Sequence, residues 1–226
     1  LEFRQQINCV HCGRLTKKSF NQGYCYPCFQ RLAQCDICIM SPEKCHYFEG
    51  TCREPEWGES HCLIDHIVYL ANSSGVKVGI TRGTQVPTRW IDQGAVAALP
   101  IFRVSNRLQS GLVETLYKSH VADKTSWQAM LKGEPDEVDL AARRDELFEL
   151  CQPGLKELQE NHGLQAIQAI SDIPVQHIHF PVETYPLKVK SFNLDKVPVV
   201  EGTLIGIKGQ YLIFDTGVIN IRKYAG

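Results

Sequence analysis

The stretch that decides the fold reads His66-Ile-Val-Tyr-Leu-Ala71, then Asn72-Ser-Ser-Gly75, then Val76-Lys-Val-Gly-Ile-Thr81. The two outer runs are apolar and rich in β-branched and aromatic residues, which favour extended backbone. The four residues between them readily adopt the dihedral angles of a tight turn. The sequence therefore predicts a β-hairpin over residues 66–81.

The residues that follow the hairpin predict a helical turn, a strand and a longer helix. Residues 87–92 open with a proline, which suits the first turn of a helix, and residues 96–104 are almost entirely apolar. Beyond them, Leu108, Leu112 and Leu116 recur on one helical face, so Glu114 lies on another face, free to reach a ligand. A small sheet covered by helices, of class α+β, is the expected result.

This order of elements resembles the GIY-YIG endonuclease superfamily. Ile67-Val-Tyr69 stands in place of the Gly-Ile-Tyr motif, and Lys77-Val-Gly79 stands in place of Tyr-Ile-Gly. Arg89 matches the arginine of the family's first helix, and Glu114 matches its metal-binding glutamate. The sequence departs from the family where the first glycine and the second tyrosine are missing, and where Gln93 replaces a histidine.

The resemblance implies a catalytic set of Tyr69, Lys77, Arg89 and Glu114. Tyr69 would act as general base, because a phenol beside a cation such as Lys77 loses its proton more easily than one in water. Arg89 would hold the phosphate, and Glu114 would bind Mg²⁺ or Mn²⁺. Lys77, Arg82 and Arg89 are the expected contacts to nucleic acid. Without the resemblance, core packing and solvated surface charges explain the same residues.

Cysteines dominate the N-terminal quarter, where nine of the ten lie within the first 62 residues. The spacing Cys9-x2-Cys12 and Cys25-x2-Cys28, with a turn and a helix start between and after the pairs, predicts a treble-clef-like module that holds one structural zinc ion. Paired thiols at this spacing favour zinc in a reducing cytoplasm over disulfide bonds.

A second zinc ion is expected from the surplus of ligands that follows. Spacing alone favours Cys35 with Cys38 as its first pair, and it also allows Cys38 and Cys45 with Cys62 and His66. The stretch resembles a family of unknown function in which a cysteine module precedes a hairpin reading His-x-Val-Tyr-Leu. That resemblance implies the ligands Cys38, Cys45, Cys62 and His66, with Cys35 and Cys52 as alternates. An iron–sulfur or binuclear thiolate cluster is the remaining alternative.

Charge is distributed unevenly along the chain. Residues 67–135 carry 8 basic and 4 acidic side chains, as suits a phosphate-facing site, whereas residues 136–175 carry 3 and 9. The acidic segment predicts two helices separated by Gln152-Pro-Gly154, with Cys151 as a buried thiol. Residues 175–226 predict a β-meander with hairpin turns at 208–210 and 215–217.

Four segments are therefore expected: a zinc module at 1–65, a GIY-YIG-like domain at 66–134, a helical segment at 135–174, and a β-meander or small barrel at 175–226. The expected function is binding of nucleic acid, DNA or RNA, with metal-dependent phosphodiester cleavage. The alternative is a non-catalytic adaptor whose zinc module binds nucleic acid or protein on an inactive nuclease-like scaffold. No apolar run is long enough to cross a membrane, so no membrane partner is expected.

Overall fold

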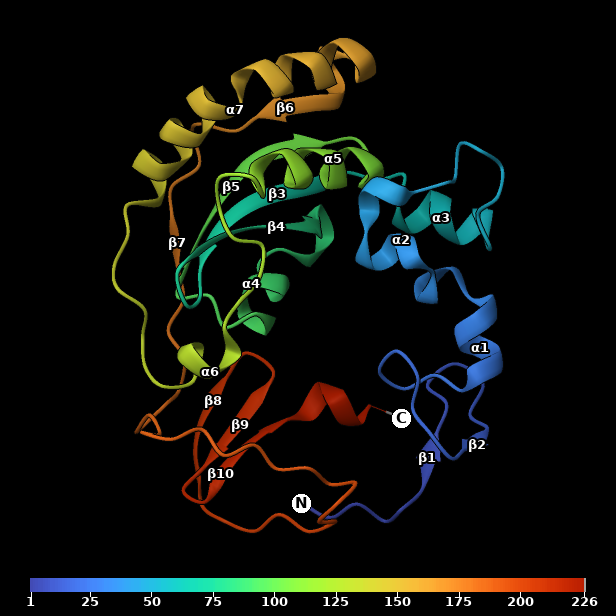
Figure 1. Cartoon of the computed structure of the whole chain (residues 1–226), viewed down its shortest axis with the longest axis vertical. Coiled ribbons are helices and arrows are strands. Elements are labelled where there is room, and N and C mark those ends of the chain that lie inside the picture. Colours follow the sequence, from blue (N-terminus) through green and yellow to red (C-terminus); the bar gives the residue numbers. More distant parts are fainter. Residues whose placement is uncertain (226) are drawn as a thin grey trace.

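The computed structural model describes residues 1–225 as a mixed α/β fold with three sheets (Figure 1). The central sheet is antiparallel throughout, with the strand order β4-β3-β5-β6, and β7 also pairs with β5. Its strands are β3 (His66–Asn72), β4 (Val76–Arg82), β5 (Ala97–Val104), β6 (Ile167–Ala169) and β7 (Gln176–His177). Strands from beyond residue 134 thus complete the sheet that the hairpin begins.

The predicted hairpin is confirmed, because β3 and β4 pair antiparallel along their whole length. Its turn is closed by the N–H of Gly75, which lies at φ +118° and donates to Oδ1 of Asn72 at 3.2 Å. This backbone conformation favours glycine. The register places Tyr69 opposite Gly79, and Lys77 two positions before Gly79. Tyr69 and Lys77 therefore project from the same face of the sheet.

Helices cover both faces of the central sheet. α5 (Arg107–Tyr117) and α7 (Leu140–His162) lie on one face, and α4 (Thr88–Asp92) lies on the other (Figure 1). Because successive side chains of β3 point to opposite faces, each face has its own core. The first core includes Val68, Leu70, Val78, Val113 and Leu147, and the second includes Tyr69, Ala71, Trp90, Ala95 and Ala98.

The predicted break between two helices in the acidic segment is wrong, because α7 continues through Pro153. Leu147 and Cys151 are buried in the first core, so the expectation of a buried Cys151 is confirmed. Gly154 lies so close to α5 that an added Cβ would be 2.6 Å from a methyl carbon of Leu116. This packing outweighs the backbone hydrogen bond that a proline removes from a helix. No helix within residues 1–225 has the length and apolar character to span a bilayer.

The cysteine-rich segment consists of short elements. β1 and β2 form a two-stranded sheet, a bridge between Phe20 and Tyr24 follows, and α1 has Pro27 in its first turn, as predicted. The elements are β1 (Ile7–Asn8), β2 (Leu15–Thr16), α1 (Tyr26–Arg31), α2 (Ile37–Met40) and α3 (Pro55–His61), with 3-10 helices at Ala33–Cys35 (η1) and Pro42–Lys44 (η2).

The C-terminal part forms a separate three-stranded antiparallel sheet of order β10-β9-β8. Its two tight turns contain Gly209 and Gly217, as the sequence predicts, and Gly209 has φ +59°. The remaining elements are β8 (Leu204–Lys208), β9 (Tyr211–Phe214), β10 (Gly217–Asn220), α6 (Trp127–Met130) and the 3-10 helices η3 (Gly83–Gln85), η4 (Leu164–Ala166) and η5 (Ile221–Tyr224).

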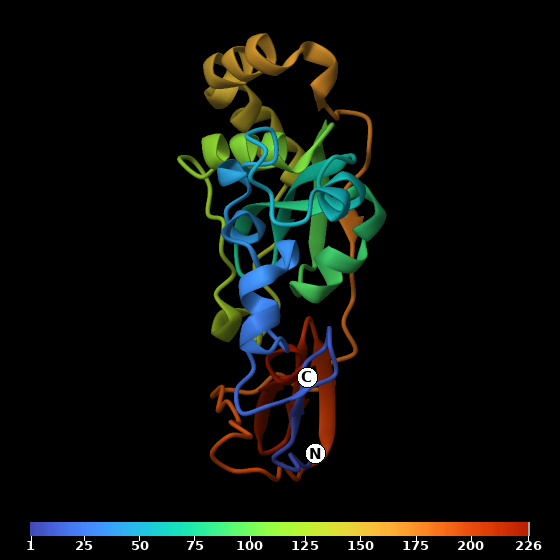
Figure 2. The ribbon, with the colours of Figure 1, turned by 90° about the vertical axis from the view of Figure 1, so that its right-hand side faces the viewer.

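The beginning of the chain packs against the C-terminal part (Figure 2). The backbone of Glu2 pairs with that of Val199, and the Phe3 N–H donates to the carbonyl of Pro198 at 2.7 Å. Further along, Arg222 Nε donates to Oε1 of Gln22 at 2.7 Å. The cysteine-rich module is thus fixed at both of its ends, to the C-terminal sheet and to the central sheet.

Candidate functional site

The first predicted ligand set forms a compact thiol cluster. The sulfur atoms of Cys9, Cys12, Cys25 and Cys28 all lie within 4.8 Å of one another, and all but Cys12 are buried. A turn from Cys9 to Gly13 supplies the first pair, with the Gly13 N–H donating to the Cys9 carbonyl at 2.8 Å. The second pair lies at the start of α1. Four sulfurs at these distances can bind one zinc ion with no open coordination position.

Electrostatics around this cluster favours a bound cation. Burial raises the pKa of Cys9, but backbone hydrogen bonds from Cys12, Cys25 and His11 outweigh it and lower that pKa to about 6. Burial and the neighbouring thiols instead raise the pKa of Cys28 to about 12. The protein environment thus favours the thiolate of Cys9 and opposes that of Cys28. A divalent cation supplies the charge that allows all four thiols to ionise.

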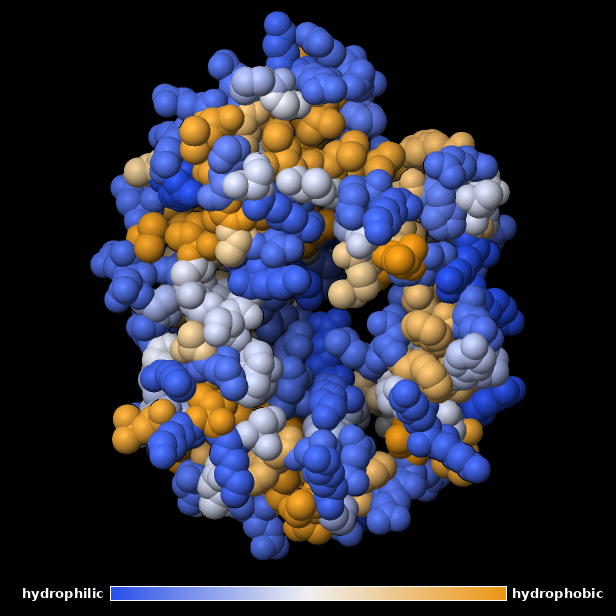
Figure 3. Space-filling model, viewed as in Figure 1, coloured by the Kyte–Doolittle hydropathy of each residue, from blue (hydrophilic) through white to orange (hydrophobic). Residues whose placement is uncertain are grey.

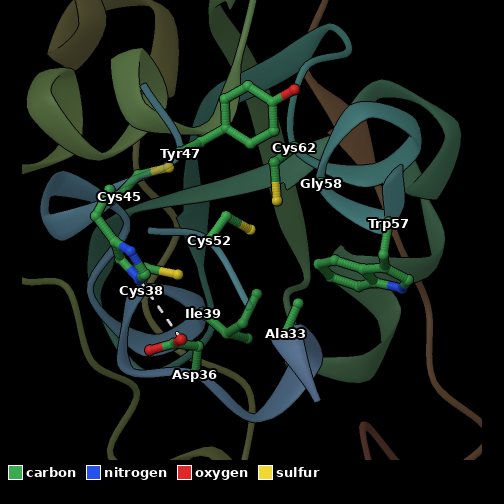
Figure 4. Close-up of a pocket in the computed structure, with 11 residues that line it drawn as sticks. Ala33, Asp36, Cys38, Ile39, Cys45, Tyr47, Cys52, Trp57, Gly58 and Cys62 are labelled. Atoms are coloured by element: carbon green, nitrogen blue, oxygen red, sulfur yellow. Dashed lines mark ion pairs between the residues drawn. The ribbon is translucent and has the colours of Figure 1, made fainter. Parts of the chain in front are cut away.

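Three of the four predicted ligands of the second ion line one pocket. Cys38, Cys45 and Cys62 line one pocket, and the alternate Cys52 lines it with them (Figure 4). His66 is not among the residues that line this pocket. It is fully buried, and its Nδ1 lies 2.7 Å from the carbonyl oxygen of Ile64.

The other alternate ligand, Cys35, belongs with the first cluster. Its side chain packs in the same small core as Cys9, Cys25 and Cys28. Burial raises the pKa of its thiol. Cys35 is therefore a buried neighbour of the first site and not a member of the second pocket.

The structure brings Tyr69 and Lys77 together with Gln93 and Thr125, two residues to which the sequence assigned no role. The Tyr69 hydroxyl donates to Oε1 of Gln93 at 2.9 Å, and Lys77 Nζ donates to Oγ1 of Thr125 at 2.6 Å. Gln93 follows Arg89 by four positions, about one helical turn, and this spacing could have identified Gln93 from the sequence as a neighbour of the same site. Thr125 comes from a loop that runs along β4, where the backbone of Ala122 pairs with that of Lys77.

Arg89 and Glu114 lie close enough to act on both of these side chains. Burial lowers the pKa of Lys77 to about 8, and the charge of Arg89 adds to this shift while Glu114 opposes it. Burial raises the pKa of Tyr69 to about 12, although Arg89 acts in the opposite direction. The phenol is therefore protonated at neutral pH, which is opposite to the shift expected for a general base beside Lys77.

Glu114 faces a small network of charges at the end of α5. Its side chain is 12% exposed, its Oε2 lies 3.4 Å from Lys118 Nζ, and Lys118 also pairs with Asp123 at 3.5 Å. Burial raises the pKa of Glu114, and Lys118 offsets this in part. Lys118 would therefore compete with a metal cation for one of the two carboxylate oxygens.

Arg82, the remaining predicted nucleic-acid contact, lies apart from this set. In the strand register Arg82 stands opposite His66, at the end of β4 that is far from Lys77. Arg82 is five positions from Lys77, so its side chain lies on the other face of the sheet. Its charge acts on His66 and on Arg107, at the N-terminus of α5. It belongs to the end of the sheet that adjoins the cysteine-rich module.

Gly79 is the residue that lets Tyr69 lie across the edge strand. A Cβ at this position would be 2.8 Å from both Cζ and the hydroxyl oxygen of Tyr69. We expect Gly79→Ala to lower the free energy of unfolding by about 1–3 kcal/mol, as over-packed cores do. Thermal unfolding would measure this, with Gly133→Ala as control, since a Cβ there meets nothing within 4 Å. Equal melting temperatures for the two variants would contradict the close packing of Tyr69 on Gly79.

Comparison with known proteins identifies a family but no characterised relative. Neither a curated protein nor a solved structure matches the chain. One family model matches residues 1–226, and its description reads "Protein of unknown function (DUF2797)". The match covers the whole chain, including the thiol cluster and the site around Tyr69. The chain therefore belongs to the DUF2797 family.

Proposed function

We propose that the protein binds nucleic acid at the site formed by Tyr69, Lys77, Arg89 and Glu114, and cleaves a phosphodiester bond there with a divalent cation. The observation that supports the proposal is that Tyr69 and Lys77 share one face of the sheet and that the charges of Arg89 and Glu114 act on both of them. The four residues stand along the sequence in the order of the GIY-YIG motifs. The treble-clef-like arrangement of the first zinc site would supply a second binding surface.

Each of the four side chains suits a step of phosphodiester hydrolysis. Arg89 and Lys77 offer positive charge and hydrogen-bond donors to phosphate oxygens. Glu114 offers a carboxylate to Mg²⁺ or Mn²⁺, which acts as a Lewis acid and activates water. The Tyr69 hydroxyl, held by Gln93, would orient that water once the site opens to it. A bound cation would also lower the pKa of the phenol from its raised value and allow it to accept a proton.

The distribution of charge supports the same surface. The excess of basic residues lies between 67 and 135, whereas the acidic residues concentrate in the segment that contains α7. Figure 3 shows a hollow lined by hydrophilic residues next to α4, between the central sheet and the cysteine-rich module. A nucleic-acid backbone would be attracted to the elements built from residues 67–135 and repelled by the acidic α7.

A non-catalytic adaptor is the second candidate, and the burial of two site residues favours it. Tyr69 is inaccessible to solvent and Lys77 is 4% exposed. Their polar atoms are already paired with Gln93 and Thr125. On this alternative, the same fold binds nucleic acid or protein without cutting it. Binding experiments test what both candidates share, and a cleavage assay separates them.

The binding prediction concerns Lys77 and Arg89. We expect Lys77→Met and Arg89→Gln each to weaken nucleic-acid binding and to lower the slope of log affinity against log salt by about 0.7–0.9, the share of one phosphate contact. Fluorescence anisotropy with single- and double-stranded DNA and RNA over a salt series would measure it. Lys156→Met, on the exposed face of α7, is the control. Wild-type affinity and slope in both site variants would contradict nucleic-acid binding here.

A further inference from the structure

We propose that Cys38, Cys45, Cys52 and Cys62 together bind a second metal centre, distinct from the one at the first thiol cluster. All four line one pocket, and Figure 4 shows their sulfur atoms directed into it. They come from α2, from the turn after η2, from the loop before α3 and from the end of α3. Four thiols from separate short elements therefore line one pocket, although the local conformation of each element does not by itself require this.

The walls of the pocket are suited to a thiolate-bound metal. Apolar groups of Ala33, Ile39 and Trp57 line it beside the sulfurs. At Gly58, an added Cβ would lie 3.6 Å from the Cys52 sulfur and 3.1 Å from the Tyr47 ring, so this wall is closely packed. Thiolates in an apolar pocket gain a counter-charge when a soft cation binds.

An aspartate and a histidine also line the pocket. Asp36, Cys38 and His46 have ligand atoms within 4.8 Å of one another. However, Oδ2 of Asp36 already accepts from Arg53 Nε at 2.7 Å, and Nδ1 of His46 lies 2.7 Å from Oγ1 of Thr51. Asp36 is therefore engaged by Arg53, whereas Nε2 of His46 lies 3.5 Å from Oδ2 of Asp36. His66 does not line the pocket and Cys52 does, so Cys52 is the fourth thiol of the proposed centre.

The spacing of the sulfurs bears on the kind of metal. A single zinc ion with Zn–S bonds of about 2.3 Å holds its four sulfurs about 3.8 Å apart. The first cluster approaches this spacing, whereas within residues 1–225 the four sulfurs of the second set do not form a group within 4.8 Å. The second set would have to close around a zinc ion or rearrange around an iron–sulfur cluster. Thiolates bind both kinds of centre, and the zinc, iron and sulfide content of the protein distinguishes them.

The second centre would brace the cysteine-rich module against α5. The Arg107 N–H donates to the carbonyl of Cys62 at 2.8 Å, and Arg107 Nη2 donates to that of Ile39 at 2.6 Å. One turn further, the backbone of η2 lies so close to Gly111 that an added Cβ would be 2.7 Å from the Pro42 carbonyl carbon. Metal bound between α2 and α3 therefore holds the helix that carries Glu114.

The test is the metal content of the full chain, purified without oxygen or added metal. Zinc, iron and acid-labile sulfide would be measured per chain for the wild type and for Cys52→Ser. We expect one zinc ion plus a second centre, either zinc or an iron–sulfur cluster, in the wild type, and loss of only the second centre in Cys52→Ser. His66→Gln, Cys35→Ser and Cys151→Ser are matched controls that should keep both centres.

Two results would overturn the proposal: a single zinc ion and no iron in the wild type, or a second centre that survives in Cys52→Ser but is lost in His66→Gln. If Cys52→Ser does not fold, thiol alkylation of the wild type followed by peptide mass spectrometry replaces it. We expect the four cysteines of the pocket to react only after a chelator has removed the metal, and Cys151 to react equally with and without the chelator. Equal reactivity of the four thiols before and after chelation would also overturn it.

Discussion

Glu114→Gln is expected to reduce phosphodiester cleavage by about three orders of magnitude and to leave nucleic-acid binding intact or stronger. The amide keeps the shape of the side chain and can still accept a hydrogen bond from Lys118, which lies 3.4 Å from the carboxylate. It cannot hold a divalent cation in the same way, so the Lewis acid and the activated water are lost together. Loss of one negative charge favours the binding of a polyanion.

Tyr69→Phe should have a similar effect, because it removes only the hydroxyl that is bonded to Gln93. Tyr117→Phe is the matched control: Tyr117 is equally buried, lies on the other side of the sheet, and has a hydroxyl without a hydrogen-bond partner among residues 1–225. Glu160→Gln, on the exposed face of α7, controls for the charge change. The assay would use single- and double-stranded DNA and RNA with Mg²⁺ or Mn²⁺. A wild type that cuts none of them, or site variants that cut at its rate, would leave only the adaptor.

Loss of the first zinc site is expected to unfold the cysteine-rich module. Structural zinc in small modules contributes folding free energy on the order of 10 kcal/mol, more than short elements of two to seven residues can replace. Cys25 is the N-cap residue of α1 and is buried in the cluster. Cys25→Ala should therefore lose one equivalent of zinc and expose residues 1–35 to protease, while the central sheet keeps its own core.

Zinc analysis, limited proteolysis and thermal unfolding measure this effect, with Cys151→Ser as control. Cys151 is also buried, but it lies on α7, far along the sequence from the other nine cysteines. Treatment of the wild type with a zinc chelator should reproduce the proteolysis pattern of Cys25→Ala. Full zinc content and unchanged protease resistance in Cys25→Ala would contradict a structural role for the cluster.

The parts of the fold that follow from local rules could be predicted from the sequence. The turn residues between Ala71 and Val76 and the alternation of β3 determine the hairpin. The spacing of Cys9, Cys12, Cys25 and Cys28 similarly leaves one sensible metal geometry. In both cases, neighbours in the sequence carry the information.

The parts that depend on distant contacts could not be predicted. Pro153 is a local signal for a helix end, but packing of α7 on α5 overrides it. Which cysteines line the second pocket depends on how loops between short elements fold back, which spacing does not encode. The burial that raises the pKa of Tyr69 also arises from tertiary packing and reverses a prediction made from neighbouring charge alone.

The pairing of the first residues with the C-terminal part sets an order of assembly during synthesis. The bonds from Leu1 to Val200 and from Arg222 to Gln22 join residues 199 and 200 positions apart. A nascent chain therefore presents the cysteine-rich module, with the metals it has captured, long before its docking surface leaves the ribosome. Until then the module lacks the contacts that residues 198–222 supply. Its docking onto them is then a late event of folding, because the contacts that it makes span about 200 residues.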